Sequence, residues 1–436
     1  MKSVWNDSVT LPSYPHLDGS RKTDVLIIGG GMAGILCAWE LKQAGIDCLL
    51  IESDRIMGGV SVNTTAKITS QHGLIYDQLI RRFGVEKARL YLRANEAALS
   101  RYHRLSQTIP CDFETKDSYI YSMNLPEKLD RELSALSRIG FSGDFVSSLP
   151  FPFPVAGAVR LRDQAQFHPL RFVQGLLPGL RICEHTAARS WDGRSILTDY
   201  GRITPEKIIV ATHFPIFNKH GSYFLKLYQH RSYVLGLKDG PQVNGMYMDE
   251  EKTGLSFRNY GDLLLLGGGA HRTGKSGGGW EELEVFARRH YPDCEIEYRW
   301  ATQDCMSLDS VPYIGQYCAS TPNIYVATGF NKWGMTTSMV AAGILRDLVQ
   351  GKSNPYAKVF SPSRTMLRPQ LALNALESTV NLLTPTRPRC PHMGCALKWN
   401  PQEHTWDCPC HGSRFSRDGK LLENPATDDL PRKPWQ

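Results

Sequence analysis

Two short clusters of cysteine and histidine lie near the end of the 436-residue chain. One has the pattern C-x-H, with Cys390 and His392, and the other has the pattern C-x-x-H, with Cys408 and His411. Two thiolates on one iron and two neutral imidazoles on the other are the ligand set of a mixed-ligand [2Fe-2S] centre. The same four side chains also suit a tetrahedral zinc site, so zinc remains the rival metal.

The sequence around these four residues resembles the Rieske iron-sulfur family. Each cluster holds an additional cysteine, and the contexts Gly-Cys and Cys-His-Gly-Ser accompany them. The resemblance implies one iron bound by Cys390 and Cys408, the other bound by His392 and His411, and a disulfide between Cys395 and Cys410. It also predicts a hairpin from residues 398–400 and 405–407.

This C-terminal domain is abridged, because only a short linker stands where Rieske domains usually have several strands. A single hairpin with its cluster loops buries little apolar surface by itself. We expect the domain to be completed by packing on the rest of the chain or on a partner. The alternative is a remnant that holds its cluster poorly.

A glycine-rich turn near the other end of the chain follows a buried strand. Residues 25–28 are apolar, residues 29–34 match G-x-G-x-x-G, and a helical pattern leads to a second apolar strand that ends at Glu52. In such a unit Gly29 allows the tight turn, Gly31 lets the backbone approach a pyrophosphate, and Gly34 lets helix and strand pack closely. The helix N-terminus favours phosphate, and Glu52 is placed to bind a ribose diol. The stretch therefore predicts a dinucleotide site.

The continuation of this unit resembles the FAD-dependent oxidoreductases of the D-amino-acid oxidase, glycine oxidase and sarcosine oxidase superfamily. Arg55 is followed by two glycines at 58–59 and by the Thr- and Ser-bearing stretch 63–73. The resemblance implies that the cofactor is FAD. Its implied contacts in this part of the chain are Met32, Ala33, Arg55, Gly59, Asn63, Thr64, Thr65 and Lys67.

Two later segments resemble other parts of the same flavin-binding fold. Residues 165–177 and the buried strand 208–212 correspond to its second segment, with His213 where many relatives have glycine. Residues 309–315, the strand 323–327 and the stretch 328–337 correspond to its C-terminal motif. A helix N-terminus at this point can stabilise the negative charge of a reduced flavin. The implied contacts are Ala211, Thr212, Gly329, Gly334, Met335 and Thr336.

Four residues are candidates for contact with substrate. Lys67 and His72 belong to the stretch beside the flavin. Arg258 lies on a predicted hairpin, 255–260 and 263–268, that covers the flavin in the resembled family, and His271 lies in the glycine-rich loop directly after it. The alternative for each is an ordinary hydrogen-bonded or solvent-exposed polar residue. Some amine-oxidising relatives have a basic residue near the position of Thr336, and its absence argues against a simple amine oxidase.

Residues 269–276 fit the P-loop pattern G-x-x-x-x-G-K-[ST]. A working P-loop needs a helix that begins at the lysine, so that its amides face phosphate. Here three glycines follow at 277–279, and glycine is a poor helix former. We therefore expect a loose loop and no triphosphate site.

Composition excludes several classes of protein. The formal charge of +7 is spread through the chain, and the longest basic cluster (Arg81, Arg82, Lys87 and Arg89) is short, so we expect no nucleic-acid partner. No apolar run approaches the roughly 18 residues of a membrane span, and the first 22 residues lack the features of a targeting signal. Seven of the eleven cysteines are scattered singly, as is typical of reduced core thiols. We expect a cytoplasmic protein.

The predicted fold is an α/β Rossmann-like FAD-binding domain with an inserted α+β substrate domain on a mixed or antiparallel sheet, followed by a small all-β Rieske-like domain. The predicted boundaries are a lead-in at 1–23, the FAD-binding domain at 24–75, 155–215 and 305–350, the substrate domain at 76–154 and 216–304, a linker at 351–388, and the Rieske-like domain at 389–436.

Pairing a two-electron flavin with a one-electron cluster suggests a dehydrogenase that takes a hydride from a small substrate and relays electrons through the cluster to an external carrier. The family resemblance implies an amine or amino acid as substrate. No second dinucleotide fingerprint follows, which disfavours direct reduction by bound NAD(P)H. Two alternatives stay open: a flavin oxidase that uses O₂ and keeps a structural or vestigial cluster, and a non-catalytic FAD-binding redox sensor.

Overall fold

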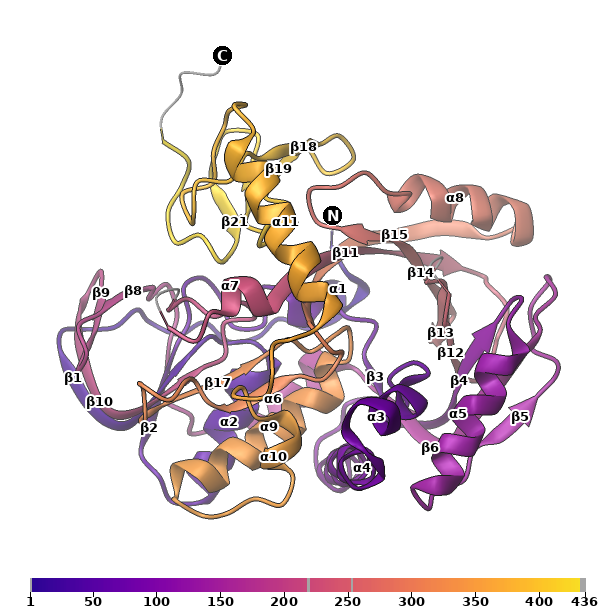
Figure 1. Ribbon diagram of the computed structural model, residues 1–436, viewed down its shortest axis with the longest axis horizontal. Coiled ribbons are helices and arrows are strands. Elements are labelled where there is room, and N and C mark those ends of the chain that lie inside the picture. The colour runs from indigo at the N-terminus through magenta and orange to yellow at the C-terminus, as the bar shows by residue number, and fades with distance from the viewer. Residues whose placement is uncertain (1, 218–219, 252–253, 432–436) are drawn as a thin grey trace.

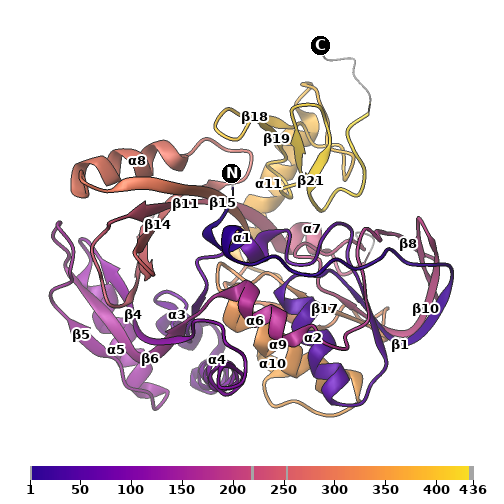
Figure 2. The same cartoon turned by 180° about the vertical axis from the view of Figure 1, so that it is seen from behind.

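The structure is a computed structural model that describes residues 2–217, 220–251 and 254–431. Figure 1 shows two large sheets side by side, with a third, small sheet above their junction. Figure 2 shows the same arrangement from behind, with the helices α2, α6 and α9 on one side of the junction and α3, α4 and α5 on the other. None of the helices in the described part of the chain is long and apolar enough to cross a membrane.

The first sheet has eight strands and a parallel centre. Strands β7, β2, β1, β10 and β17 run parallel in that order, and β16 pairs antiparallel with β17 at one edge. Strand β9 pairs antiparallel with β10 and with β8. Helices α2 and α9 pack against each other on this sheet. The elements are β1 (Arg21–Ile28), α2 (Met32–Gln43), β2 (Cys48–Ile51), α6 (Pro169–Leu176), β7 (Ile182–Cys183), β8 (Ala188–Trp191), β9 (Ile196–Thr198), β10 (Gly201–Val210), β16 (Tyr313–Gln316), β17 (Ile324–Thr328), α9 (Gly334–Val349) and α10 (Ala357–Phe360).

The second sheet has nine strands in the order β15-β11-β14-β13-β12-β4-β6-β3, with β5 paired to β6. All pairings are antiparallel except that of β12 with β4. The elements are β3 (Lys67–Ile68), α3 (Ile75–Phe83), α4 (Val85–Ser106), β4 (Glu114–Ser122), α5 (Pro126–Arg138), β5 (Asp144–Val146), β6 (Gly157–Gln166), β11 (Leu227–Lys238), β12 (Met246–Asp249), β13 (Ser256–Tyr260), β14 (Leu263–Arg272), α8 (Gly279–His290) and β15 (Glu295–Ser307). Three short helices lie outside these groups: α1 (Val4–Ser8), η1 (Val60–Asn63) and α7 (Tyr223–Lys226).

The C-terminal module is a four-stranded antiparallel meander preceded by one helix. Its elements are α11 (Pro369–Leu383), β18 (Lys398–Asn400), β19 (Thr405–Asp407), β20 (Arg414–Ser416) and β21 (Leu421–Glu423). Its own core has eight buried apolar side chains, four of which are cysteines. So small a core supplies little stability, and the module packs on strands β11 and β14 of the second sheet (Figure 1).

The predicted fold class is confirmed: a parallel nucleotide-binding sheet, a mixed second sheet and a small all-β C-terminal module are all present. The predicted hairpins are also present as β13–β14 and β18–β19. Strand β14 continues to Arg272 and the next helix begins only at Gly279, so no helix begins at Lys275 and the P-loop reading is excluded. Strands β3 and β6 belong to the second sheet, although the predicted boundaries put them in the flavin segments. Those boundaries stay a prediction.

Candidate functional site: a dinucleotide cavity beside a cluster site

Two positions, Gly29 in the turn after β1 and Gly34 in the first turn of α2, have room only for glycine. Gly29 has φ +110°, and a Cβ built on it would lie 2.6 Å from the carbonyl oxygen of Ala211. A Cβ on Gly34 would lie 1.8 Å from the carbonyl oxygen of Gly29. Gly31, whose added Cβ would lie 3.0 Å from Ser61 Oγ, directly precedes α2 and lies on a cavity wall. This is the backbone approach that a pyrophosphate requires.

Glu52 follows β2 and lies beside this turn. Its Oε2 accepts a hydrogen bond of 2.6 Å from the Gly30 N–H, and its Oε1 accepts one of 3.0 Å from the Asp54 N–H. The carboxylate is therefore fixed on the cavity wall at the position predicted for a ribose.

The cavity has a volume of about 880 Å³, within the range in which proteins hold cofactor-sized ligands. It is bounded by the first sheet, by the second sheet and by the C-terminal module. Of the predicted FAD contacts, these line it: Gly29, Gly31, Met32, Ala33, Glu52, Arg55, Gly59, Asn63, Thr64, Thr65, Lys67, Ala211, Thr212, Gly329, Gly334 and Met335. The volume, the glycine turn and the acid fit FAD.

Two predicted FAD contacts, Gly34 and Thr336, do not line the cavity and have packing and hydrogen-bonding roles in the structure. Gly34 permits the close packing of turn and helix described above. Thr336 lies in the first turn of α9, where its Oγ1 accepts a hydrogen bond from Thr69 N–H at 2.9 Å and donates one to Thr69 O at 3.0 Å. Thr336 therefore fixes α9 to the chain beside β3, while Gly334 and Met335 present the helix N-terminus to the cavity.

Arg55 lies on the cavity wall, but its guanidinium is engaged elsewhere. It pairs with Glu184 at 3.1 Å and donates to Ser13 Oγ at 2.6 Å. These contacts fasten the N-terminal segment to the flavin side of the molecule. A direct contact between Arg55 and the cofactor stays a prediction.

Lys67 is the only one of the four predicted substrate-side residues that lies on the cavity wall. Its Nζ donates to the Tyr247 carbonyl at 3.3 Å. Burial, reinforced by the positive charge of Arg258, lowers the pKa of Lys67 to about 7. The amine can therefore exchange a proton near neutral pH, as proton-transfer catalysts do.

The other three candidates do not line the cavity, and their polar groups are used in hydrogen bonds. Arg258 donates to the carbonyls of Thr65 at 2.8 Å and Ala66 at 2.9 Å and so holds the Thr-rich turn. His271 Nε2 bonds the Tyr233 hydroxyl at 3.0 Å.

His72 bonds Tyr91 and the Thr69 carbonyl and stacks on Trp333, and burial lowers its pKa to about 3. Trp333 itself lines the cavity, so His72 supports the wall from behind. Contact of Arg258, His271 and His72 with substrate stays a prediction.

Among the wall residues that were not predicted as contacts are the titratable His213, Asp304 and Lys332. His213 has φ +64° and Lys332 has φ +73°, in the left-handed region that favours glycine. Burial lowers the pKa of Lys332, and the negative charge of Asp304 opposes this shift. Burial raises the pKa of Asp304. Lys332 lies within the recognised stretch 328–337, so its charge was the available signal. Asp304 lies in a strand with no local motif.

The cluster loops present their ligand groups together in the C-terminal module. Each loop is closed by a glycine with positive φ: the Gly394 N–H donates to the Cys390 carbonyl at 2.8 Å, and the Gly412 N–H donates to the Cys408 carbonyl at 2.9 Å. The two loops bring the rings of His392 and His411 to a centroid distance of 4.8 Å.

The two histidines fit a metal cluster. All four ring nitrogens of His392 and His411 are buried without a hydrogen-bond partner in the described part of the protein. An unpaired buried polar atom costs roughly 1–3 kcal/mol, and a metal ligand role explains one such nitrogen in each of the two rings. Burial lowers the pKa of His392 to about 4, which leaves the neutral imidazole that binds metal.

The thiols gather at the same place. Sγ of Cys395, Cys408 and Cys410 all lie within 4.8 Å of one another. The structure has all of these cysteines as free thiols. The assignment of Cys390 and Cys408 as ligands, and of Cys395 and Cys410 as a disulfide, stays a prediction from the resemblance.

The dinucleotide cavity and the cluster site share a wall. Thr212 and His213 line the cavity, and the ring of the next residue, Phe214, lies 6.1 Å from the His392 ring and 6.0 Å from the His411 ring, centroid to centroid. Asn424 of the C-terminal module donates to the carbonyls of Thr212 and Phe214. The module also contributes directly to the cavity wall, through Leu421, Leu422, Glu423, Asn424, Ala426, Thr427, Asp428 and Asp429.

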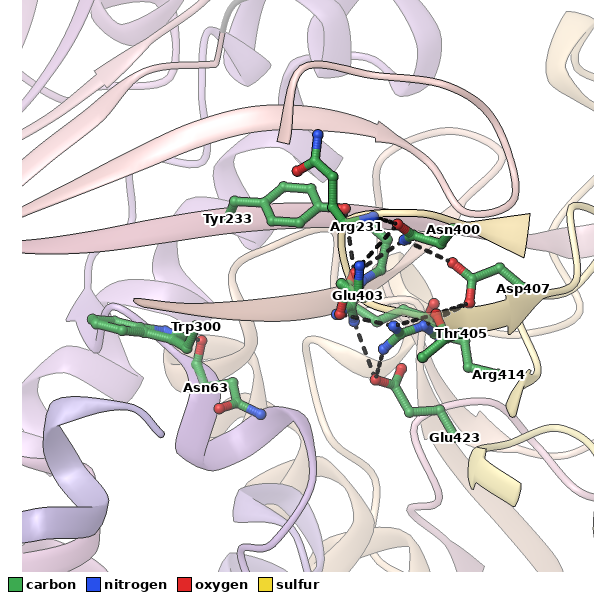
Figure 3. A network of polar contacts seen from close by, with 12 residues as sticks. Asn63, Arg231, Tyr233, Trp300, Asn400, Glu403, Thr405, Asp407, Arg414 and Glu423 are labelled. Carbon is green, nitrogen blue, oxygen red and sulfur yellow. Dashed lines mark hydrogen bonds and ion pairs between the residues drawn. The ribbon is translucent and has the colours of Figure 1, made fainter. Parts of the chain in front are cut away.

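A buried ion network fixes the module in this position (Figure 3). Arg231, on strand β11, pairs with Glu403 and, at 3.1 Å, with Glu423 of the module. Arg414 pairs with Glu403 at 2.7 Å, with Glu423 at 2.8 Å and with Asp407 at 3.0 Å. The abridged domain is thus completed by packing on the flavin-binding part of the chain. Glu403 and Arg231 were not predicted, because neither stands in a recognisable motif.

Comparison with known proteins agrees with both halves of this site. Residues 24–348 match the family profile described as FAD dependent oxidoreductase, and residues 371–434 match the Rieske [2Fe-2S] domain. The chain is 35% identical to YhfW of Bacillus subtilis (strain 168), described as a Rieske 2Fe-2S iron-sulfur protein, over 98% of this chain and 97% of that protein.

Other similar proteins match about four fifths of the chain. Gamma-glutamylputrescine oxidoreductase of Escherichia coli (strain K12) is 23% identical over 79% of this chain and 87% of its own. Among solved structures, glycine oxidase from Geobacillus kaustophilus has a TM-score of 0.67 at 18% identity, covering 79% of this chain and 99% of its own. L-proline dehydrogenase from P. horikoshii has a TM-score of 0.67 at 16% identity, covering 80% and 98%. The chain belongs to the FAD-dependent oxidoreductase family and carries a C-terminal Rieske [2Fe-2S] domain.

Proposed function

We propose that the protein is a dehydrogenase that oxidises a small amine or amino acid at the C–H bond next to nitrogen and passes the electrons, one at a time, to an external carrier. When bound, the flavin accepts a hydride and the [2Fe-2S] cluster transfers single electrons. The substrate class is supported by the similar proteins, which are described as acting on gamma-glutamylputrescine, glycine and L-proline.

The chain's own residues suit an amine substrate. An amine must be unprotonated for its neighbouring C–H bond to release a hydride. Lys67, with a pKa of about 7 and a place on the cavity wall, can accept a proton from a substrate ammonium group. The N-terminus of α9, at Gly334 and Met335, offers backbone amides to negative charge that develops in the cavity.

The observation that best supports electron transfer between the two sites is their shared wall, residues 212–214. Phe214 is fully buried between the cavity and the two cluster histidines, and Asn424 ties the backbone on either side of it to the cluster module. The histidine side of the cluster loops therefore faces the flavin cavity, and the ion network of Arg231 and Arg414 keeps it there. The seven free thiols outside the cluster loops support the cytoplasmic location that we include in the proposal.

The test compares the wild-type protein with His411→Ala, purified anaerobically with FAD content measured. A panel of amines and amino acids is mixed with each protein, and flavin bleaching is followed without oxygen. We expect both proteins to bleach at similar rates with the same substrate. Turnover with a one-electron acceptor should fall at least tenfold in the variant.

Two outcomes would contradict the proposal. Rapid, steady oxygen consumption by the variant, equal to that of the wild type, would make the protein an oxidase with a structural cluster. If no member of the panel bleached the flavin of the wild type, the redox-sensor alternative would replace the enzyme.

A further inference from the structure

Helix α11 lies on the molecular surface with polar residues facing the protein and apolar residues facing outward. Its buried residues are polar: Asn374 and Asn381, seven positions apart, face the protein. Asn374 bonds the Leu225 carbonyl at 3.1 Å and the Arg272 guanidinium at 3.1 Å. The carbonyl of Asn381 accepts from the Ala396 N–H at 3.0 Å, and Glu377 pairs with Lys275 at 2.7 Å. These bonds fix which face of the helix points outward.

The outward face of α11 is apolar. Leu373, Leu376, Val380 and Leu383 follow the i, i+3, i+7 spacing of a single helix face, and their exposed fractions are 56%, 62%, 52% and 78%. Of the thirteen large hydrophobic side chains that are exposed in the described residues, seven lie between positions 367 and 393. Such a concentration marks an interaction surface and not scattered surface leucines. Besides the four residues of the α11 face, these seven exposed side chains include Leu367, Leu382 and Met393.

Cations lie beside the start of this face. Arg368 follows the exposed Leu367, and its guanidinium lies 5.1 Å from the Phe83 ring, while Lys87 Nζ lies 5.9 Å from the same ring. The charge of Arg368 also lowers the pKa of the neighbouring Arg82, after the larger effect of burial. Within the described ranges, no carboxylate lies at ion-pair distance from Arg82, Lys87 or Arg368.

The acids near this cation cluster are already used. Asp77 pairs with Arg81 at 2.6 Å, and Glu86 pairs with Arg89 at 3.0 Å. Residues 351–389 contain six lysines and arginines, of which Arg364 is paired with Asp309 at 2.7 Å. The single acid of this stretch, Glu377, is paired with Lys275. The apolar face is therefore bordered by positive charge that the protein itself leaves uncompensated.

We propose that the outer face of α11, with Arg82, Lys87 and Arg368, binds the surface of an anionic lipid bilayer. An exposed leucine-rich helix face bordered by basic residues is the pattern of interfacial helices, which lie in the headgroup region without crossing the membrane. Anionic headgroups supply the missing countercharge. A second copy of the chain would offer the same apolar face but would add the same cations and no free acid. α11 lies at the front in Figure 1, on the same side as α3 and α4.

Binding in this way would turn the cluster module toward the bilayer, because Cys410 Sγ lies 4.0 Å from the Glu377 carbonyl on the inner side of α11. The binding itself does not depend on the proposed redox function, so it is measured separately.

The experiment is flotation of the purified holoprotein with vesicles of phosphatidylglycerol and phosphatidylcholine, or of phosphatidylcholine alone. We expect flotation with the anionic vesicles, at least tenfold less with the neutral ones, and release by high salt. Leu376→Glu combined with Leu383→Glu should reduce flotation at least tenfold. The matched control is Val285→Glu, which changes an apolar side chain that is 59% exposed on α8 and should leave flotation unchanged. Arg82→Gln combined with Lys87→Gln should remove the preference for anionic vesicles.

FAD content and far-UV circular dichroism, unchanged in every variant, keep the test independent of folding. The proposal would be overturned if the wild-type holoprotein did not float with anionic vesicles. It would also be overturned if sedimentation showed a dimer that Leu376→Glu with Leu383→Glu dissociates, with no vesicle binding by either protein, since the face would then serve a second copy.

Discussion

Replacing Glu403 with glutamine tests how the cluster module is held on the flavin-binding part of the chain. The Glu403 side chain is 9% exposed, and the side chains of its partners Arg231 and Arg414 are 2% and 5% exposed. Its carboxylate accepts from Arg231 Nε at 3.0 Å, from a second Arg231 nitrogen, and from Arg414 at 2.7 Å. Three charge-assisted hydrogen bonds therefore depend on one side chain.

The expected cost follows from what remains after the change. Glutamine keeps one neutral acceptor, and both arginines keep Glu423, while Arg414 also keeps Asp407. Breaking a buried ion pair by removing one partner costs roughly 3–5 kcal/mol. Because other carboxylates remain, we expect the lower end, a loss of about 3 kcal/mol in the free energy of unfolding of the module. In the double variant with Arg231→Met, the two changes should cost about 2 kcal/mol less than their sum.

The assay is urea unfolding followed by the visible circular dichroism of the cluster. The matched control is Lys420→Gln, which breaks the exposed pair of Lys420 with Asp429 in the same module and should cost below about 1 kcal/mol. Burial opposes ionisation of Glu403, but the charges of Arg231 and Arg414 outweigh it and lower its pKa. Its stabilising effect should therefore be complete above the unfolded pKa of about 4.3 and be lost as the pH falls through the lower folded value. Equal effects of Glu403→Gln and Lys420→Gln, or strict additivity with Arg231→Met, would refute the reasoning.

Three further predictions concern the cofactor and substrate sites. Lys67→Met should slow flavin reduction by about 10²-fold and remove a rise in rate as the pH increases through about 7, because the neutral amine forms above its pKa; stopped-flow pH profiles check this, with the exposed Lys352→Met as control, and an unchanged profile would exclude Lys67 from the proton transfer. Gly34→Ala should yield protein without FAD, since the new Cβ would lie 1.8 Å from the Gly29 carbonyl oxygen, whereas Gly343→Ala in α9, whose Cβ meets no atom within 4 Å, should keep it; absorption spectra decide, and equal FAD content would contradict the packing argument. His411→Ala should lose the electron paramagnetic resonance signal of a histidine-ligated [2Fe-2S] centre while keeping FAD, and a retained signal would exclude His411 as a ligand.

The sequence predicted those parts of the site that local motifs encode. The turn at Gly29 and Gly34 is built from consecutive residues, so its geometry follows from the glycine positions. The same holds for the cluster loops, where the histidines predicted as ligands stand two or three residues from their cysteines. In both cases short-range sterics decide the structure.

Long-range contacts decided what the sequence could not show. The 421–429 segment lines a cavity whose glycine turn lies nearly four hundred residues earlier, and only the folded arrangement brings them together. Arg258 donates to two carbonyls of the Thr-rich turn, which no local motif indicated, and its predicted contact with substrate stays a prediction. The apolar face of α11 points outward, because the buried Asn374 on its inner face bonds the Leu225 carbonyl and the Arg272 guanidinium.

The most direct test of the account is a rapid-freeze electron paramagnetic resonance measurement on the anaerobic wild-type protein after mixing with an amine that bleaches its flavin. If the wall at Phe214 connects the two sites, the low-average-g signal of a reduced histidine-ligated [2Fe-2S] centre should grow as the flavin is reduced. A fully bleached flavin beside a cluster that stays oxidised would contradict the relay, and with it the central claim that the two sites act together.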